Sequence, residues 1–182
     1  MSKENYIDKV VVSEQLKNYS DRFKENEKLD IPAPIVPDDL AVSLLKMANK
    51  VGYKYRFRDY TYVDEMISDA IIICLKYMHR FDSKFGNTGF NYLTTLIHNA
   101  FFNRINIERK QQYIRSKEFV GCYEQNISSF VADHAVGNDP SEVYKDSISF
   151  VTKYEQQMEE AKLKKKNKNK CDVFDEFERD FV

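Results

Sequence analysis

The feature that most constrains the fold of this chain is an apolar stripe at helical spacing between residues 64 and 81, where no glycine or proline interrupts the sequence. Residues three and four positions apart lie on one face of an α-helix, so the stripe predicts a helix that faces a core, with Thr61 or Asp64 as its cap. The stripe consists of Ile67, Ala70, Ile71, Cys74, Met78 and Phe81. A second line at the same spacing mixes acidic, hydroxyl and aliphatic side chains, and we interpret it as a surface that receives a partner. It consists of Glu65, Ser68, Asp69, Ile72 and Leu75.

Two further helices are predicted on either side of this one. The first begins at Asp38 and Asp39, which offer N-cap chemistry, and ends near Gly52. Its apolar face holds Leu40, Leu44, Ala48 and Val51. The second runs from about residue 90 to residue 115, after a turn at residues 83–89. It is expected to bury Leu93, either Leu96 or Ile97, Ala100, Phe101 and Ile105. Short connections between such helices favour an all-α fold, a compact bundle of three to four helices.

The segments around this bundle differ in composition. Residues 1–37 are expected to be an N-terminal arm, either a polar helix or loosely ordered, ending in a linker with three of the four prolines. Residues 38–117 are the predicted helical domain, in which residues 53–62 have the period of a short strand but more readily form a loop or a helix end. Residues 118–163 are acidic and partly helical from Pro140 to about Leu163. A basic linker at residues 164–170, expected to be disordered, precedes a tail at residues 171–182.

Composition limits the classes of protein to which the chain can belong. With 182 residues, of which 42% are hydrophobic and 31% charged, it can bury one core of about 100 residues. It has neither a long uncharged apolar run nor the apolar core of a signal peptide, so we expect a soluble intracellular protein. Its three cysteines are widely separated and lack CxxC spacing, which indicates a reducing compartment.

The net charge of −1 conceals a strong partition along the chain. Residues 40–117 contain 13 basic and 6 acidic residues, whereas residues 1–39 contain 6 basic and 9 acidic ones. Residues 118–160 are again acidic, with 2 basic and 9 acidic residues. A basic domain between acidic flanks is compatible with a polyanion-binding surface, because neutralisation of phosphates drives nucleic-acid affinity. A merely solvated basic face is the alternative.

Residues 66–81 resemble, without a gap, the polymerase-binding helix of region 2 in bacterial sigma factors. The matching positions are Asp69, Ala70, Lys76 and the triplet at residues 80–82, followed by a turn glycine at Gly86. The resemblance covers roughly residues 40–110. It implies that Glu65, Ser68, Asp69, Ile72 and Leu75 bind the coiled coil of the largest subunit of a host RNA polymerase core.

The resemblance continues into the following helix, which looks like the promoter-melting and promoter-reading helix of that family. Phe90, Tyr92, Ile97, Asn99 and Ala100 match if one residue is deleted between the first two. This implies that aromatic rings hold unstacked bases, that Asn99 stands where the family has a base-reading glutamine, and that basic residues bind phosphates. The implied set for the promoter −10 region is Phe90, Tyr92, Thr95, His98, Asn99, Phe102, Asn103, Arg104, Arg109 and Lys110.

The chain departs from the family pattern at two points. Thr95 and Leu96 stand where most members have adjacent tryptophans, and the chain has no tryptophan, which implies weak intrinsic melting that needs a co-activator. Nothing after residue 117 resembles the domain that reads the upstream promoter element, so recognition is expected to rest on an AT-rich −10 element alone.

The tail at residues 171–182 carries hydrophobic residues among acids, in the manner of a tethered docking peptide. Together with a truncated region 2, it is similar to the late-transcription sigma factors of large tailed phages, whose C-termini bind the phage sliding clamp. The implied clamp-binding residues are Val173, Phe174, Phe177 and Phe181. This resemblance places the protein in the cytoplasm of an infected bacterial cell.

Other classes of function have little support in the sequence. The three histidines are not at zinc spacing, and neither a phosphate-binding loop nor a catalytic motif is recognisable, so we expect no metal, no cofactor and no enzyme. Two alternatives remain: a polymerase-binding adaptor or anti-sigma protein that does not read DNA, and a single-strand nucleic-acid binder that does not engage polymerase.

Overall fold

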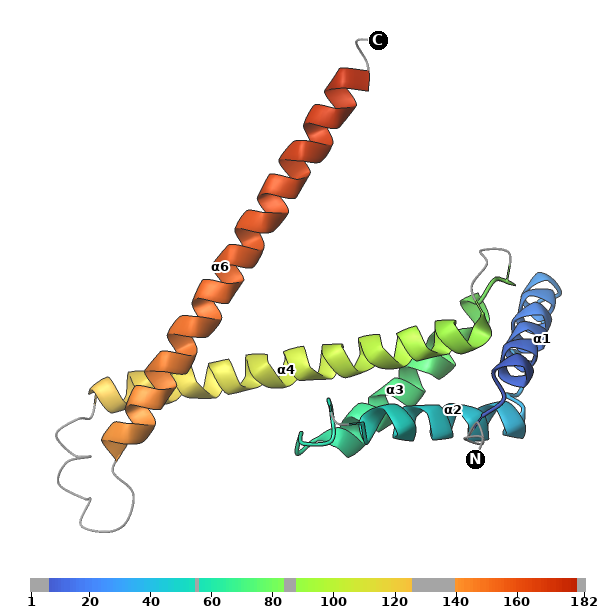
Figure 1. Ribbon diagram of the computed structural model, residues 1–182, viewed down its shortest axis with the longest axis horizontal. Coiled ribbons are helices and arrows are strands. Elements are labelled where there is room, and N and C mark those ends of the chain that lie inside the picture. The colour runs from blue at the N-terminus through green and yellow to red at the C-terminus, as the bar shows by residue number, and fades with distance from the viewer. Residues whose placement is uncertain (1–6, 55, 84–87, 126–139, 180–182) are drawn as a thin grey trace, which may run out of the picture. The chain divides into compact units, whose positions relative to one another are not determined.

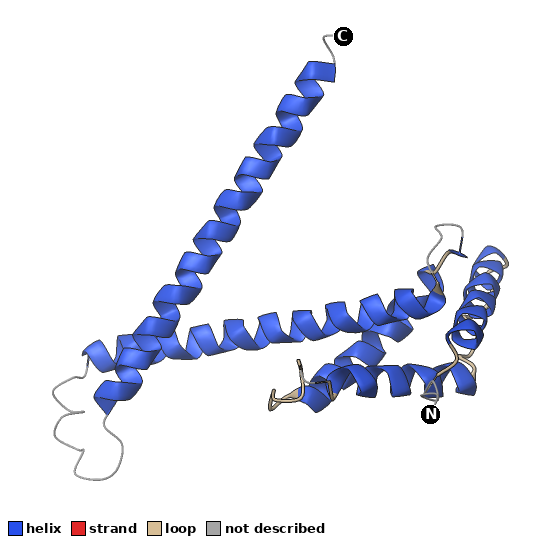
Figure 2. Ribbon diagram, in the orientation of Figure 1, coloured by secondary structure: helices blue, strands red, loops and turns tan. Residues whose placement is uncertain are grey.

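The computed structural model describes residues 7–54, 56–83, 88–125 and 140–179, without the side chains of Pro140 and of residues 165–179. Every regular element in these ranges is helical, which confirms the predicted all-α fold class (Figure 2). The chain divides into two compact units, residues 1–107 and residues 108–182. Within the described ranges, each helix is too short or too polar to span a membrane.

Unit 1 packs its helices, which are labelled in Figure 1, around an apolar core that is defined by its buried side chains. The elements are α1 (Lys9–Lys28), α2 (Asp38–Gly52), α3 (Val63–Tyr77), the 3-10 turn η1 (Met78–Arg80) and the first part of α4 (Gly89–Gln125). The predicted stripe of α3 is buried except for Ile71, which is half-buried, and the predicted inner face of α4 is buried at Leu93, Ile97, Ala100, Phe101 and Ile105. These two faces form the centre of the bundle, as their periodicity indicates.

The helix starts differ from those predicted. Pro37 is the N-cap residue of α2 and Tyr62 that of α3, and neither makes a side-chain capping bond. The prediction of Thr61 or Asp64 as the cap of α3 was therefore wrong. Asp64 instead lies in the first turn of α3, where its carboxylate accepts a hydrogen bond from Tyr53 at 3.1 Å and interacts favourably with the helix dipole.

The N-terminal segment is packed and not a loosely ordered arm in its described part. Helix α1 buries Leu16 completely, together with Val12, Tyr19 and Ser20. Its N-terminus is capped by Asp8, whose carboxylate accepts a hydrogen bond from the backbone N–H of Val10 at 2.9 Å. Gly89, at the start of α4, permits a close approach to this helix, since a Cβ there would lie 2.8 Å from Ser13 Cα.

Polar side chains of α1 also bind the chain where η1 ends. Ser20 Oγ lies 2.7 Å from the carbonyl oxygen of Phe81 and 2.8 Å from that of His79, and Lys24 Nζ donates to the Phe81 carbonyl at 3.2 Å. Phe23 stacks on the His79 ring with centroids 4.4 Å apart. Helix α1 therefore satisfies carbonyls at a helix end that would otherwise lack partners.

Two helices extend beyond their predicted ends. Helix α4 continues to Gln125, ten residues past the predicted end, and α6 spans Pro140–Arg179. The backbone of α6 thus continues as a helix past Leu163 and through residues 164–170, which the sequence had suggested to be a disordered linker. Residues 56–62 form turns, as expected of a connecting loop, and bury Phe57.

Candidate functional site

The predicted partner surface of α3 is exposed to solvent over most of its length. Glu65 and Ser68 are exposed, Asp69 is half-buried, and the apolar side chains of Ile72 and Leu75 are 61% and 42% exposed. These residues lie beside the buried stripe, because they are offset from it by roughly a quarter to almost a half of a helical turn around the α3 axis. Helix α3 therefore has one apolar face in the core and two adjacent aliphatic side chains in water, an arrangement that suits a protein-binding surface.

An ion pair joins this surface to α4. Arg104 Nη1 of α4 lies 3.3 Å from Asp69 Oδ2 of α3, and both side chains are about one-third exposed. The sequence had placed Asp69 in the polymerase-binding set and Arg104 in the DNA-binding set, so the structure brings the two sets into contact. A phosphate that binds Arg104 would compete with Asp69 for the guanidinium group.

Helix α4 presents a line of polar side chains on its outer face. Thr95, Asn99 and Asn103 are exposed, and His98 is half-buried. Side-chain contacts within α4 fix two of them: Thr95 Oγ1 donates to the Asn91 carbonyl at 2.9 Å, and His98 Nδ1 lies 2.8 Å from the Thr94 carbonyl oxygen. Asn99 is exposed on this face, so its side-chain amide is accessible to a base edge in a groove.

Two of the predicted base-stacking rings take part in the packing of unit 1. The hydroxyl of Tyr92 donates to the Tyr77 carbonyl at 2.9 Å, its ring lies 5.5 Å from that of Phe81, and burial raises its pKa. Phe90 is half-buried, with Lys9 Nζ 5.3 Å from its ring centroid. Both rings are already engaged, so a base could stack on either only after these contacts were rearranged.

Phe102 is the exposed ring of the predicted set, and it has a neighbour that the sequence did not assign to the site. Its side chain is 38% exposed, and Arg56 Cζ lies 5.2 Å from its ring centroid, within cation–π range. The ring of Phe57 also lies nearby, with its centroid 6.0 Å from that of Phe102 and its plane inclined by 70°. The alternation of aromatic and basic residues at positions 53–58 was the only signal for Arg56, and it does not reveal that the loop packs on α4.

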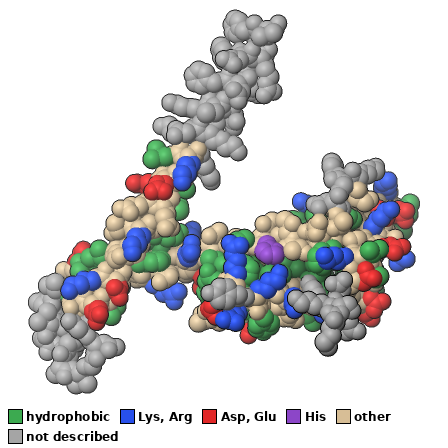
Figure 3. All heavy atoms as spheres, in the orientation of Figure 1, with side chains coloured by type: hydrophobic (Ala, Val, Ile, Leu, Met, Phe, Trp, Pro, Cys, Tyr) green, Lys and Arg blue, Asp and Glu red, His purple; other side chains and the backbone are tan. Residues whose placement is uncertain are grey.

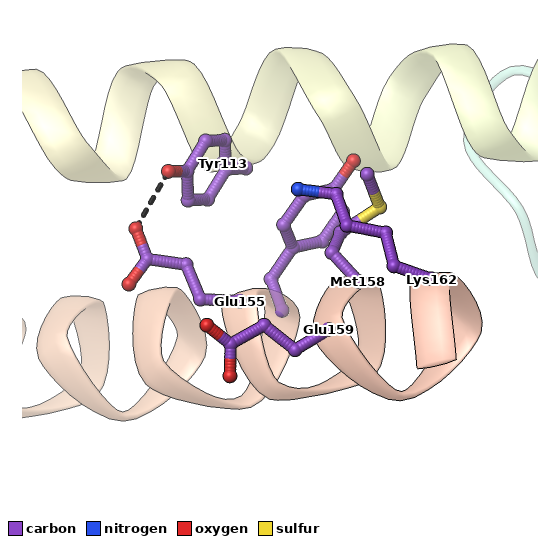
Figure 4. A pocket seen from close by; sticks show the side chains of 6 residues that line it. Tyr113, Glu155, Met158, Glu159 and Lys162 are labelled. Carbon is purple, nitrogen blue, oxygen red and sulfur yellow. Dashed lines mark hydrogen bonds between the residues drawn. The ribbon is translucent and has the colours of Figure 1, made fainter. Parts of the chain in front are cut away.

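In unit 2, the later part of α4 pairs with α6 through aromatic stacking. The rings of Tyr113 and Tyr154 lie 4.6 Å apart, and those of Tyr123 and Tyr144 lie 4.4 Å apart. A cavity of about 310 Å³ opens beside the first pair, and Figure 4 shows Tyr113 of α4 bonded to Glu155 of α6 at its edge. Its lining residues are Tyr113, Tyr154, Glu155, Met158, Glu159 and Lys162.

The hydrogen bonds around Glu155 predict a lowered pKa for its carboxyl group. Lys117 Nζ donates to this carboxylate at 2.9 Å and the Tyr113 hydroxyl at 2.7 Å, which together lower the pKa of Glu155 below its ordinary value. We expect NMR titration to show this lowered pKa, and Lys117→Met to raise it. Because the folded-state pKa is lowered, the contact stabilises the helix pair above the ordinary carboxyl pKa and is lost as pH falls through the folded value.

The matched control for that titration is Lys153→Met, which removes an exposed lysine of α6 without touching this contact. It should leave the pKa of Glu155 unchanged. If Lys117→Met also leaves it unchanged, the hydrogen bonds around Glu155 do not form in solution.

The remaining predicted site residues lie in unit 2 or outside the described part of the structure. Arg109 and Lys110 are exposed on α4. The backbone of α6 includes Val173, Phe174 and Phe177, whose side chains are not described, and Phe181 lies outside the described residues.

Nothing in the described part of the chain forms a metal-binding group of three or more His, Cys, Asp or Glu side chains. Burial raises the pKa of the Cys74 thiol to about 12, so this cysteine stays protonated at neutral pH and is a poor nucleophile. Neither models of known protein families nor curated protein sequences show a significant match to this chain.

Proposed function

We propose that this protein is an RNA polymerase sigma factor for the late genes of a phage. The observation that carries the proposal is the exposure of Ile72 and Leu75 on α3, beside the half-buried Asp69, at the positions that resemble the polymerase-binding helix. In this proposal the two aliphatic side chains pack on the coiled coil of the largest subunit of the host core enzyme. The acidic residues at the rim set the orientation of the complex.

The next helix would then present the promoter-reading face. The side-chain amide of Asn99 can give adenine a bidentate pair of hydrogen bonds, while Arg104, Arg109 and Lys110 hold phosphates and set the register. Phe102 also has a cation, Arg56, near its ring, but at 38% exposure it is the most exposed aromatic ring of this set and the one that an unstacked base can most readily reach. An AT-rich −10 element is the DNA that this set of residues suits.

Opening the duplex without a tryptophan pair requires assistance. We propose that residues 171–182 supply it by binding the phage sliding clamp through Val173, Phe174, Phe177 and Phe181. A tether of this kind raises the effective concentration of the initiation complex at clamp-loaded DNA.

A polymerase-binding adaptor that does not read DNA is the second candidate. The packing of Phe90 and Tyr92 favours it, because those rings are engaged in contacts with Lys9, Tyr77 and Phe81. The two candidates make opposite predictions about promoter selection.

Substitution of Asn99 distinguishes them. We expect wild-type protein to favour a template with the consensus −10 adenine over one with that base changed, and Asn99→Ala to lose most of this preference, worth about 1–3 kcal/mol. The measurement is initiation on paired templates by core polymerase. Asn18→Ala removes an exposed amide from α1 and should leave the preference intact. If Asn99→Ala selects promoters as wild type does, the adaptor function is favoured.

A further inference from the structure

Unit 2 exposes apolar side chains that a stable helical unit ordinarily buries. Among the described side chains of residues 108–164, Tyr123 is the only buried one. Ile114, Ile148 and Met158 are 36%, 37% and 47% exposed. Figure 3 shows hydrophobic side chains at the surface of this unit among charged ones of both signs. A pair of helices buries little apolar surface by itself, and small units of this kind commonly gain the missing burial by oligomerisation.

The three apolar side chains lie on one face of the pair formed by α4 and α6. On each helix, positions at intervals of four and three residues form a line. Two contacts place the lines on the same side of the pair: Lys117 donates to Glu155 at 2.9 Å, and the Tyr144 hydroxyl donates to Glu124 at 2.9 Å. The line on α4 consists of Lys110, Ile114, Lys117, Gly121 and Glu124. The line on α6 includes Tyr144, Ile148, Glu155 and Met158.

Gly121 gives this face room for a second helix. The backbone around it is helical, and a Cβ at this position would meet no described atom within 4 Å. Glycine in the interior of a helix is less favourable than alanine, and packing among the described residues does not require it here. The space beside Gly121 therefore permits a side chain of another helix to approach the α4 backbone closely.

The charges of the face are divided between the two helices. Lys110 and Lys117 belong to α4, whereas Glu155 belongs to α6 and Glu159 borders the α6 line. Lys117 and Glu155 are joined within one chain, and Lys110 and Glu159 are exposed. A basic edge on one helix and an acidic edge on the other make the face complementary to itself.

The tyrosine stacks determine which positions of the two helices lie at the same level. Tyr113 stacks on Tyr154 and Tyr123 on Tyr144, so ten residues along α4 correspond to ten residues back along α6. By this register, Lys110 is within two residues of the level of Glu159, or about 3 Å along the helix axis.

A twofold axis parallel to the helices turns this register into contacts between copies. The rotation lays α4 of one copy over α6 of the other at unchanged levels, and every neighbouring pair of helices is then antiparallel. Lys110 of each copy faces Glu159 of the other. Ile148 of each copy lies within two residues of the level of Gly121 in the other, where the space for its side chain exists.

We propose that two copies of this chain associate through the α4 and α6 lines into an antiparallel four-helix bundle. Ile114, Ile148 and Met158 form its apolar centre, and Met158, which lines the cavity beside Tyr113 (Figure 4), becomes covered by the second copy. The dimer is independent of the proposed function, because it uses unit 2 and none of the α3 surface.

Sedimentation velocity of the full chain over about 1–100 μM tests whether the dimer exists. We expect a monomer–dimer equilibrium without larger species, because a twofold interface closes at two copies. Monomer at every concentration would overturn the proposal, and so would species that keep growing with concentration.

Ile148→Glu tests the apolar centre. It should weaken dimerisation at least about tenfold, because two carboxylates would enter an apolar contact. Val143→Glu is the matched control, since Val143 is a β-branched aliphatic residue of the same helix, 49% exposed and outside the line. Circular dichroism should show wild-type helix content in both variants. Equal dimerisation by the two variants would overturn the assignment of this face.

Gly121→Leu fills the space that the dimer gives to Ile148 of the second copy. It should weaken dimerisation about tenfold without loss of helix content, because leucine is a better helix former than glycine. Undiminished dimerisation of this variant would contradict the proposed close approach at Gly121.

A mixture of two charge variants tests for a second copy most specifically. Lys110→Glu and Glu159→Lys each place like charges across the interface twice, so each variant alone should dimerise roughly tenfold more weakly. Mixed together, they should dimerise as wild type does, because both contacts in the mixed dimer again join opposite charges. A contact within one chain is not repaired by mixing, so failure of the mixture to recover would overturn the proposal.

Discussion

Replacing Ile72 and Leu75 together by glutamate is expected to weaken binding of the host polymerase core at least about 100-fold, or about 2.8 kcal/mol. Both side chains are exposed in the free protein, so they are available to become the desolvated centre of an interface. Glutamate at those positions would bring two carboxylates into an apolar contact, where their desolvation is costly. Affinity measured by surface capture of core polymerase tests this expectation.

The same substitutions should leave the fold intact. Exposed positions tolerate substitution within about 0.5 kcal/mol, and glutamate is a good helix former, so the thermal unfolding midpoint should move little. Ile35→Glu is the matched control, because that aliphatic side chain is 94% exposed and lies in the proline-rich segment away from α3. Wild-type polymerase affinity in Ile72→Glu/Leu75→Glu would contradict the assignment of this surface.

Leu16→Ala is expected to have the largest effect on stability, lowering the free energy of unfolding by about 2–5 kcal/mol. Leu16 is completely buried in α1, and its removal leaves a cavity against the start of α4, where its Cδ2 atom lies close to Gly89. Chemical denaturation followed by circular dichroism measures the change. A loss of this size is not expected of a residue on a loosely ordered arm.

An exposed residue of the same helix, Val10, provides the control for this stability test. Val10 is 74% exposed, so Val10→Ala should change the free energy of unfolding by no more than about 0.5 kcal/mol. If Leu16→Ala is as mild as Val10→Ala, α1 is not part of the cooperative core in solution.

The fold of unit 1 was predictable where apolar spacing directly reports burial. The α3 stripe and the inner face of α4 each repeat at three and four residues, so their contribution to the core followed from the sequence. Helix α1 was harder to place because its buried face is narrow and one of its buried residues is a serine. Ser20 is buried because its hydroxyl forms hydrogen bonds with backbone carbonyls about 60 positions away. No local sequence pattern indicates contacts over such a separation.

The candidate site likewise contains some features that the sequence predicts and others that only the tertiary packing determines. The exposure of Ile72 and Leu75 was expected from their position on the second line, beside the stripe, and that of Asn99 from its place on the outer face of α4. The pair between Asp69 and Arg104 spans 35 positions and depends on how two helices cross. The contact of Arg56 with Phe102 depends on the path of a loop, which tertiary packing decides.

The most direct test of the central claim is run-off transcription by host core polymerase on a clamp-loaded template with an AT-rich −10 element. Three reactions are compared: without the protein, with the full chain, and with a chain truncated after Lys170. We expect transcripts only when the protein is present, and stimulation by the clamp only with the full chain. Binding of core polymerase without initiation on any template would contradict the sigma function, and failure to bind core polymerase would contradict the resemblance on which it rests.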